Sequence, residues 1–227
     1  VAFTAPFASV KGTGSLKDEG GRYPVGAIRI NGQLDIEKLA SQFPATMRQT
    51  NDVKISSGMV RASIGIDSGP AKMVVAADMQ VNKLEAKRGW RTLSLDKPVQ
   101  FTGRITADEK GWTVDKAELN SSFIHGIAQG NLKSMKVSVD ANLAAVMAEA
   151  GKFADMGKFA AEGTFNLDVA VEESAQSERN VTAAMSMKGL NVAGFTPLPV
   201  KLDYLTANIV AGIRTSAGGV SDIGPVV

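Results

Sequence analysis

The chain of 227 residues contains no cysteine, so it holds neither a disulfide framework nor a thiolate metal site. Aromatic residues make up only 6% of it, and no apolar run approaches the length needed to cross a bilayer. The 25 basic and 23 acidic residues nearly cancel and are scattered along the chain. A nucleic-acid-binding surface needs a concentrated basic stripe, so this charge pattern argues against one.

The first residues, VAFTAPFASVKG, lack the charged and apolar regions of a signal peptide. The sequence begins and ends in the middle of its strand-and-turn pattern. We therefore expect the sequence to be a piece of a longer chain.

Two stretches of the sequence, 34–66 and 141–171, follow one pattern, and such self-similarity indicates a repeated structural unit. Each has an Asx residue, then an apolar stripe, then a glycine that is expected to open a strand. The matching positions are Asp35 with Asn142 and Gly58 with Gly163. A weaker echo precedes each stretch and aligns Phe7 with Phe123 and Gly14 with Gly130.

The apolar stripes predict two short amphipathic helices. Asp35 is suited to cap the first helix because its carboxylate can accept from free backbone N–H groups of the first turn. Pro44 disfavours helical geometry at the residue before it and ends the pattern after about two turns. A helix this short must lie on an apolar surface. The residues expected to cover that surface are Ile36, Leu39 and Phe43 in the first helix and Leu143, Val146 and Met147 in the second.

The rest of the sequence alternates between apolar and polar residues with the period of two that is typical of strands, separated by short polar turns. Consecutive strands with short turns pair antiparallel, so we predict a mainly β meander sheet with one apolar and one solvated face. The apolar face is predicted to contain Ile28, Ile30, Val60, Ile64, Ile66, Val75, Met79, Phe165, Leu167, Val169, Met185 and Met187. The whole chain is expected to form one segment of two related modules, at about 5–118 and 119–210, followed by a poorly patterned tail at 211–227.

This pattern resembles that of the AsmA-like and TamB-like envelope proteins, which belong to the repeating β-groove superfamily of bridge-like lipid transfer proteins. The features that carry the resemblance are the paired helix-glycine-strand units, the Pro-Val strand at 98–105 and the segment LNSSFIHGIAQGNL at 119–132. The resemblance implies a strongly curved antiparallel sheet, a β-groove, whose concave apolar face holds acyl chains. It also implies a location in the periplasm or cell envelope and membrane attachment through parts not present in this sequence.

Catalytic and metal-binding residues have little support in the sequence. His125 is the only histidine, and one histidine without cysteine makes a poor transition-metal site. We expect it to be an ordinary strand residue that faces solvent or a turn. No nucleophile elbow or phosphate-binding glycine motif is present. We therefore predict no enzymatic activity and no cofactor.

Two functions follow from the apolar face. In the first, the chain is a non-enzymatic segment that binds or conducts lipid acyl chains in envelope or outer-membrane biogenesis. In the second, it is a structural scaffold or assembly module, and the same face is ordinary core. Methionines such as Met79 and Met185 fit either function, since a flexible thioether suits both a core gap and a variable acyl chain. Exposed strand edges could also pair with the rest of the parent chain or with another protein.

Overall fold

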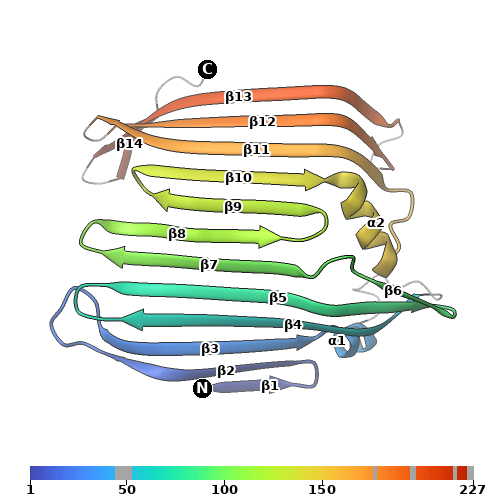
Figure 1. Cartoon of the computed structure of the whole chain (residues 1–227), viewed down its shortest axis with the longest axis horizontal. Helices are drawn as coiled ribbons and strands as arrows, with labels where there is room; N and C mark the ends of the chain where they lie inside the picture. The colour runs from blue at the N-terminus through green and yellow to red at the C-terminus, as the bar shows by residue number, and fades with distance from the viewer. Residues whose placement is uncertain (44–52, 176–177, 195–197, 217–218, 224–227) are drawn as a thin grey trace.

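A computed structural model of the chain describes residues 1–43, 53–175, 178–194, 198–216 and 219–223. Its strands form one open antiparallel sheet whose order follows the sequence from β1 to β14, except that β6 pairs with β5 away from this path (Figure 1). The first half comprises β1 (Ala2–Ala5), β2 (Ala8–Lys17), β3 (Val25–Asp35), α1 (Ile36–Gln42), β4 (Val53–Ser68), β5 (Met73–Arg88), β6 (Arg91–Ser94), β7 (Val99–Asp108) and β8 (Gly111–Asn120). The second half comprises β9 (Ile124–Asn131), β10 (Ser134–Asn142), α2 (Leu143–Phe153), β11 (Ala160–Ala175), β12 (Glu178–Ala193), β13 (Val200–Ser216) and β14 (Gly219–Ile223).

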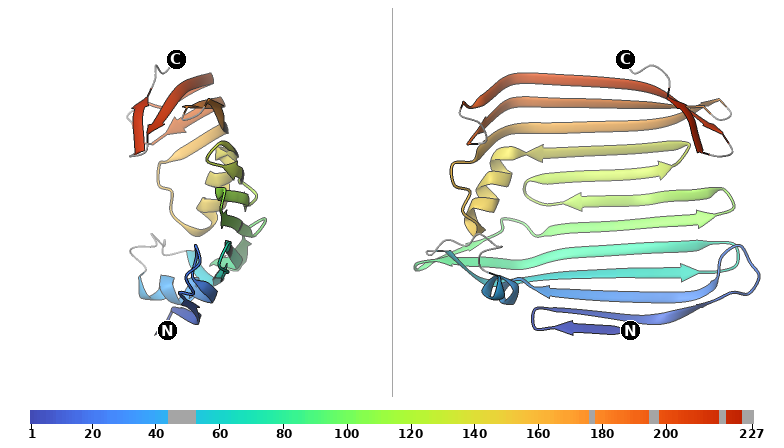
Figure 2. Two further views of the ribbon diagram at one scale, coloured as in Figure 1. Left: turned by 90° about the vertical axis from the view of Figure 1, so that its left-hand side faces the viewer. Right: turned by 180° about the vertical axis from the view of Figure 1, so that it is seen from behind.

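The sheet is a single curved layer. Seen along its strands it has the outline of a crescent, with β1 near one tip and β13 and β14 near the other (Figure 2). The two helices lie at the same end of the strands and leave most of the sheet without a second layer (Figures 1 and 2). The predicted mainly β, curved antiparallel meander with two short helices at repeated positions is confirmed.

Both helices begin where the sequence predicts. The side chain of Asp35 accepts a hydrogen bond from the backbone N–H of Lys38 at 3.0 Å, and the side chain of Asn142 accepts from Ala145 at 3.0 Å. Each side chain therefore satisfies one of the N–H groups that a helix leaves free in its first turn. Helix α1 ends at Gln42 with Phe43 as its C-cap, next to the proline that was expected to stop it.

The repeat extends to the backbone that leads into each helix. The backbone N–H of Asp35 donates to the carbonyl of Phe7 at 2.8 Å, and that of Asn142 donates to the carbonyl of Phe123 at 2.9 Å. The hairpin before each helix is therefore closed by the same hydrogen bond. This correspondence confirms the internal repeat that the sequence shows.

Gly14 and Gly130 occupy equivalent strained positions in the two copies. Their φ angles are +117° and +126°, a region that side-chain-bearing residues rarely adopt. A Cβ atom at either glycine would stand 2.0 Å from a backbone carbonyl oxygen of the next strand. At each of these positions the next strand can approach this closely only because glycine has no side chain.

Two features of the predicted pattern are wrong. Gly58 and Gly163 do not open strands, because β4 begins at Val53 and β11 begins at Ala160. Both glycines instead lie at β-bulges, where the pairing with the next strand shifts register. A glycine is favoured there because a bulge inserts an unpaired residue and bends the strand.

The expected tail at 211–227 is also wrong in part. Strand β13 continues through Gly212 to Ser216, and β14 pairs with its last residues. Backbone hydrogen bonds to β12 hold this stretch, and they require no apolar alternation. Residues 217–218 and 224–227 of that tail lie outside the described residues.

The buried core is small and lies at the helix end of the sheet. Phe153, at the end of α2, is 9% exposed and packs against Val53 and Ala86, which are 3% and 0% exposed. Among the described residues no large side chain is completely buried. Most of the sheet is therefore stabilised by strand pairing and by contacts within one layer.

Candidate functional site

The strand register places the apolar side chains on one face of the sheet. Directly opposed residues of paired strands point to the same side, so a face can be followed from strand to strand. One row across the sheet consists of Ala62, Met79, Phe101, Leu119, Gly126, Val139, Leu167, Met185 and Ala207. A parallel row consists of Ile28, Ile66, Val75, Ile105, Val114, Gly130, Met135, Val171, Val181 and Ala211. Neither row contains a polar side chain.

All twelve residues predicted to share the apolar face do share it. In the first copy Ile28 opposes Ile66, Ile30 opposes Ile64, and Val75 follows on β5. In the second copy the opposed pairs are Phe165 with Met187, Leu167 with Met185 and Val169 with Ala183. The remaining predicted residues, Val60 and Met79, oppose Val81 and Ala62. The two copies are joined through β7–β10, so we call this continuous surface the apolar face.

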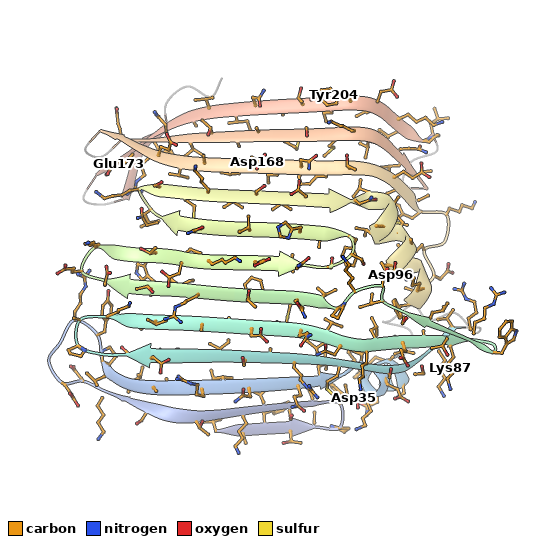
Figure 3. The ribbon with its side chains drawn as sticks, in the orientation of Figure 1. Asp35, Lys87, Asp96, Asp168, Glu173 and Tyr204 are labelled. Atoms are coloured by element: carbon orange, nitrogen blue, oxygen red, sulfur yellow. The ribbon has the colours of Figure 1, made fainter. Side chains whose placement is uncertain are left out.

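The opposite face is polar and convex. Its positions alternate with the apolar ones and include Arg61, Asp78, His125 and Asp168, each exposed. Asp168 and Tyr204 are seen on the side of the sheet that bulges toward the viewer (Figures 2 and 3). The apolar face therefore lies in the hollow of the crescent, where α1 also lies (Figure 2).

The apolar face is only partly shielded from solvent. None of the twelve predicted residues is buried, and Ile64 and Met79 are 41% and 37% exposed. The chain exposes 14356 Å² in total. A compact monomer of its 23.8 kDa would expose roughly 9,900 Å². The larger exposed area is expected for a sheet that has no second layer packed on it.

The helices lie at one end of this hollow and leave most of the apolar face uncovered. Ile36 of α1 packs near Gly58, where an added Cβ would stand 3.1 Å from Ile36 Cβ. Phe43 is 47% exposed and meets the ring of Phe7 edge to face at 5.8 Å between centroids. Leu39 is half-buried, as are Leu143, Val146 and Met147 of α2. The predicted covering residues thus lie at the rim of the apolar face.

A charged cluster beneath α2 was not predicted from the sequence. Glu149 is 3% exposed, and its Oε1 accepts from the ammonium group of Lys152 at 3.0 Å. The same ammonium donates to Asp96 Oδ1 at 2.6 Å and to the carbonyl of Ser94 at 3.0 Å. Helix α2 of the second copy is thereby attached to the β6 segment of the first copy. The available signal was the i, i+3 spacing of Glu149 and Lys152 on one helix.

Electrostatics strengthen this attachment. The hydrogen bond to Asp96 raises the pKa of Lys152 above its ordinary value, and the same bond lowers the pKa of Asp96. Glu149 also accepts from the backbone N–H of Asp96 and from the hydroxyl of Ser122, while its Oε2 is buried without a hydrogen-bond partner in the described part of the chain. A buried carboxylate of this kind depends on its cation, so Lys152 holds the end of α2 in place.

A cavity of about 580 Å³ lies over strands β9 to β13, and most of the side chains that line it belong to the convex face. Its floor consists of small residues, among them Ser138, Ala170 and Ala184, and Lys136 and Asp168 stand beside them. Ile127 and Val210 line its two ends. Residues of the apolar face, among them Val169 and Ala183, also contribute to its lining.

Within the described residues no group of three or more His, Asp and Glu side chains is placed to hold a metal ion. His125 is exposed on the convex face, which agrees with its prediction as a solvent-facing strand residue. Neither helix of the described chain is long and apolar enough to cross a membrane. No protein-family model, no curated protein and no solved structure matches this chain.

Proposed function

We propose that the chain is a non-enzymatic segment that binds or conducts lipid acyl chains along its apolar face. The observation that carries this proposal is the continuous, uncharged and half-exposed apolar face in the hollow of a single-layer sheet. Exposed apolar surfaces much larger than a few hundred Å² are uncommon on monomers and mark binding surfaces. We further propose, from the resemblance of the sequence pattern to AsmA-like proteins, that this role belongs to lipid transport and outer-membrane biogenesis in the cell envelope.

The driving force is the removal of methylene groups from water. Each methylene that leaves water contributes about 0.8 kcal/mol, so ten methylenes contribute about 8 kcal/mol before the cost of association is subtracted. Met79, Met185 and Met187 supply flexible thioethers in the hollow, and such side chains adapt to chains of different shape.

The chemistry of the face also determines what it does not recognise. No charged side chain stands in either row described above, so these rows offer no partner for a phosphate or an amine. Lipid headgroups would therefore remain at the solvated rim. We expect selection for acyl chains and weak selection among headgroups.

Native mass spectrometry of the purified chain, with lipid extraction, tests the proposal. We expect co-purified lipid in the wild type and its loss in Leu167→Lys, which places a charge on the apolar face. The matched control is Asp168→Lys, one residue further along the same strand on the exposed convex face. This control should fold and retain lipid.

The scaffold function makes the opposite prediction. If the apolar face were ordinary core, Leu167→Lys would unfold the chain and the wild type would carry no lipid. A lipid-free wild type that also fails to take up a fluorescent fatty acid would overturn the proposal. Far-UV circular dichroism of each variant separates loss of lipid from loss of fold.

A further inference from the structure

The turn between β5 and β6 presents an exposed tryptophan. Arg88 of β5 pairs with Arg91 of β6, so Gly89 and Trp90 alone form the turn. Trp90 is 88% exposed, and the guanidinium of Arg91 stands 5.1 Å from the centroid of its ring. The hairpin extends past the ends of the neighbouring strands, on the side of the sheet where the helices lie (Figure 1). Because a tryptophan stabilises a fold through burial, a ring this exposed contributes little to the fold.

Cations surround this turn. Lys54 of β4 opposes Lys87 of β5, and Arg88 opposes Arg91 across the hairpin. Lys87 is seen at this end of the sheet in Figure 3. From 86 to 92 the sequence contains three basic residues and no acidic one. Like charges directly opposite each other destabilise a sheet, so the stability of the fold does not explain this arrangement. We call the following residues the basic tip: Lys54, Lys87, Arg88, Trp90 and Arg91.

The carboxylates nearest to the hairpin in the sequence have other partners. Glu85 accepts a hydrogen bond from the hydroxyl of Ser57, and Asp96 accepts from the ammonium group at the end of α2. Within the described part of the chain no carboxylate forms an ion pair with Lys87 or Arg91. The basic tip therefore keeps a positive charge that the fold does not neutralise.

The internal repeat shows that the module does not require this tip. In both copies the corresponding turn follows the second strand after a helix, at the same end of the sheet. At the base of the turn Ala86 pairs with Leu93 in the first copy, and Val192 pairs with Val200 in the second. The second-copy turn, 193–199, contains no charged residue and no tryptophan. The cations and the tryptophan therefore belong to one copy and not to the shared architecture.

We propose that the basic tip docks on the surface of a lipid bilayer that contains anionic lipids. An indole ring is favoured at the membrane–water interface, where its apolar part leaves water and its N–H stays hydrated. Each lysine or arginine near an anionic surface strengthens binding by a factor of about five. Docking through the tip does not require lipid on the apolar face, so it stands independently of the proposed function.

The size and shape of the tip favour a bilayer over a protein or a nucleic acid. A stable protein interface takes roughly 20–30 residues from each partner, far more than a two-residue turn and its flanking cations provide. Single-stranded nucleic acid is bound in basic grooves with several aromatic side chains, whereas this tip is a projecting turn with one. A bilayer surface needs no matching pocket, since one ring can enter the interface while cations meet the headgroups.

Tryptophan fluorescence tests the docking, because the chain contains only two tryptophans. Trp112 begins β8 at the opposite end of the strands and is 49% exposed, so it provides the matched control. Trp112→Phe leaves Trp90 as the only tryptophan. On adding vesicles of phosphatidylcholine and phosphatidylglycerol in equal parts, we expect its emission to shift to the blue and to be quenched by brominated lipid. Vesicles of phosphatidylcholine alone should have little effect, and the emission of Trp112 in Trp90→Phe should stay unchanged.

Co-sedimentation with the same vesicles tests the role of charge. Lys87→Gln with Arg91→Gln removes two cations from the tip and should weaken partitioning onto the anionic vesicles about 25-fold. Lys72→Gln with Lys110→Gln removes the same charge from exposed positions at the other end of the strands. Because salt screens charges at that distance, this control should change partitioning by less than about threefold. All four positions are exposed, so circular dichroism should show an unchanged fold.

The chain is stripped of lipid before the vesicles are added, so the proposed binding of acyl chains can fail without changing these results. An unchanged emission of Trp90 with anionic vesicles, an equal shift of Trp112, or equal partitioning of the two double variants would overturn the docking proposal. A shift of Trp90 emission with a single-stranded DNA oligonucleotide, but not with vesicles, would assign the tip to nucleic acid and overturn it as well.

Discussion

The contrast between Phe153→Ala and Ile64→Ala measures how open the apolar face is. Phe153 is 9% exposed in the cluster with Val53 and Ala86, so its truncation leaves a cavity and should lower the free energy of unfolding by about 3–5 kcal/mol. Ile64 lies on the apolar face and is 41% exposed, so no closed cavity forms when it is truncated.

The expected effect at Ile64 follows from its exposure. Truncation to alanine removes three carbon groups, each contributing about 0.8 kcal/mol when fully buried. About three-fifths of the side chain is shielded, which reduces the total to about 1.4 kcal/mol. A closed core would instead give about 2–5 kcal/mol for the same substitution.

The assay is urea unfolding of lipid-free protein, followed by circular dichroism. Lipid must be removed first because a ligand that binds only the folded state adds its own stabilisation. Ser63→Ala, the neighbour on the convex face, serves as control and should change stability by less than about 0.5 kcal/mol. An effect at Ile64 as large as that at Phe153 would refute the open face.

Three further predictions concern the caps, the charged cluster and the glycines. The hydrogen bond from the Lys38 N–H lowers the pKa of Asp35, so the carboxylate stabilises the fold above its unfolded pKa and this stabilisation is lost as pH falls through the folded value. The stability difference between wild type and Asp35→Asn should therefore change below about pH 4 and stay constant near neutrality, and an unchanged difference in acid would contradict the cap. Lys152→Met leaves the carboxylate of Glu149 buried without its cation and should destabilise by about 2–4 kcal/mol in urea unfolding, whereas Lys152→Met with Glu149→Gln should recover most of the loss. Equal losses in the single and double variants would show that Lys152 acts through packing alone. Gly14→Ala and Gly130→Ala place a Cβ 2.0 Å from a carbonyl oxygen and should each lower the thermal midpoint strongly, while Gly12→Ala, whose nearest contact is 3.8 Å, should change it little. A tolerant Gly130→Ala would mean that the strands can separate there without loss.

Local pattern alone was enough to predict the fold class, the two caps and the composition of the apolar face. The cap at Asp35 depends on hydrogen bonds within one turn, and the face of Ile64 or Leu167 depends on a period of two, so both are properties of neighbouring residues. The sequence aligned Phe7 with Phe123, and only the structure shows that each carbonyl accepts the same backbone hydrogen bond next to its own helix.

The bulges at Gly58 and Gly163 and the cluster of Asp96, Glu149 and Lys152 were decided by the tertiary structure. Each depends on the register or position of a segment distant in the sequence: Asp96 meets α2 only because the sheet brings the two copies together. Whether the apolar face is covered is a property of the same kind. The alternation of residues along a strand indicates which side is apolar. What covers that side depends on the number and placement of all the other helices and strands. Here two short helices lie at one end of the sheet, so the face remains open.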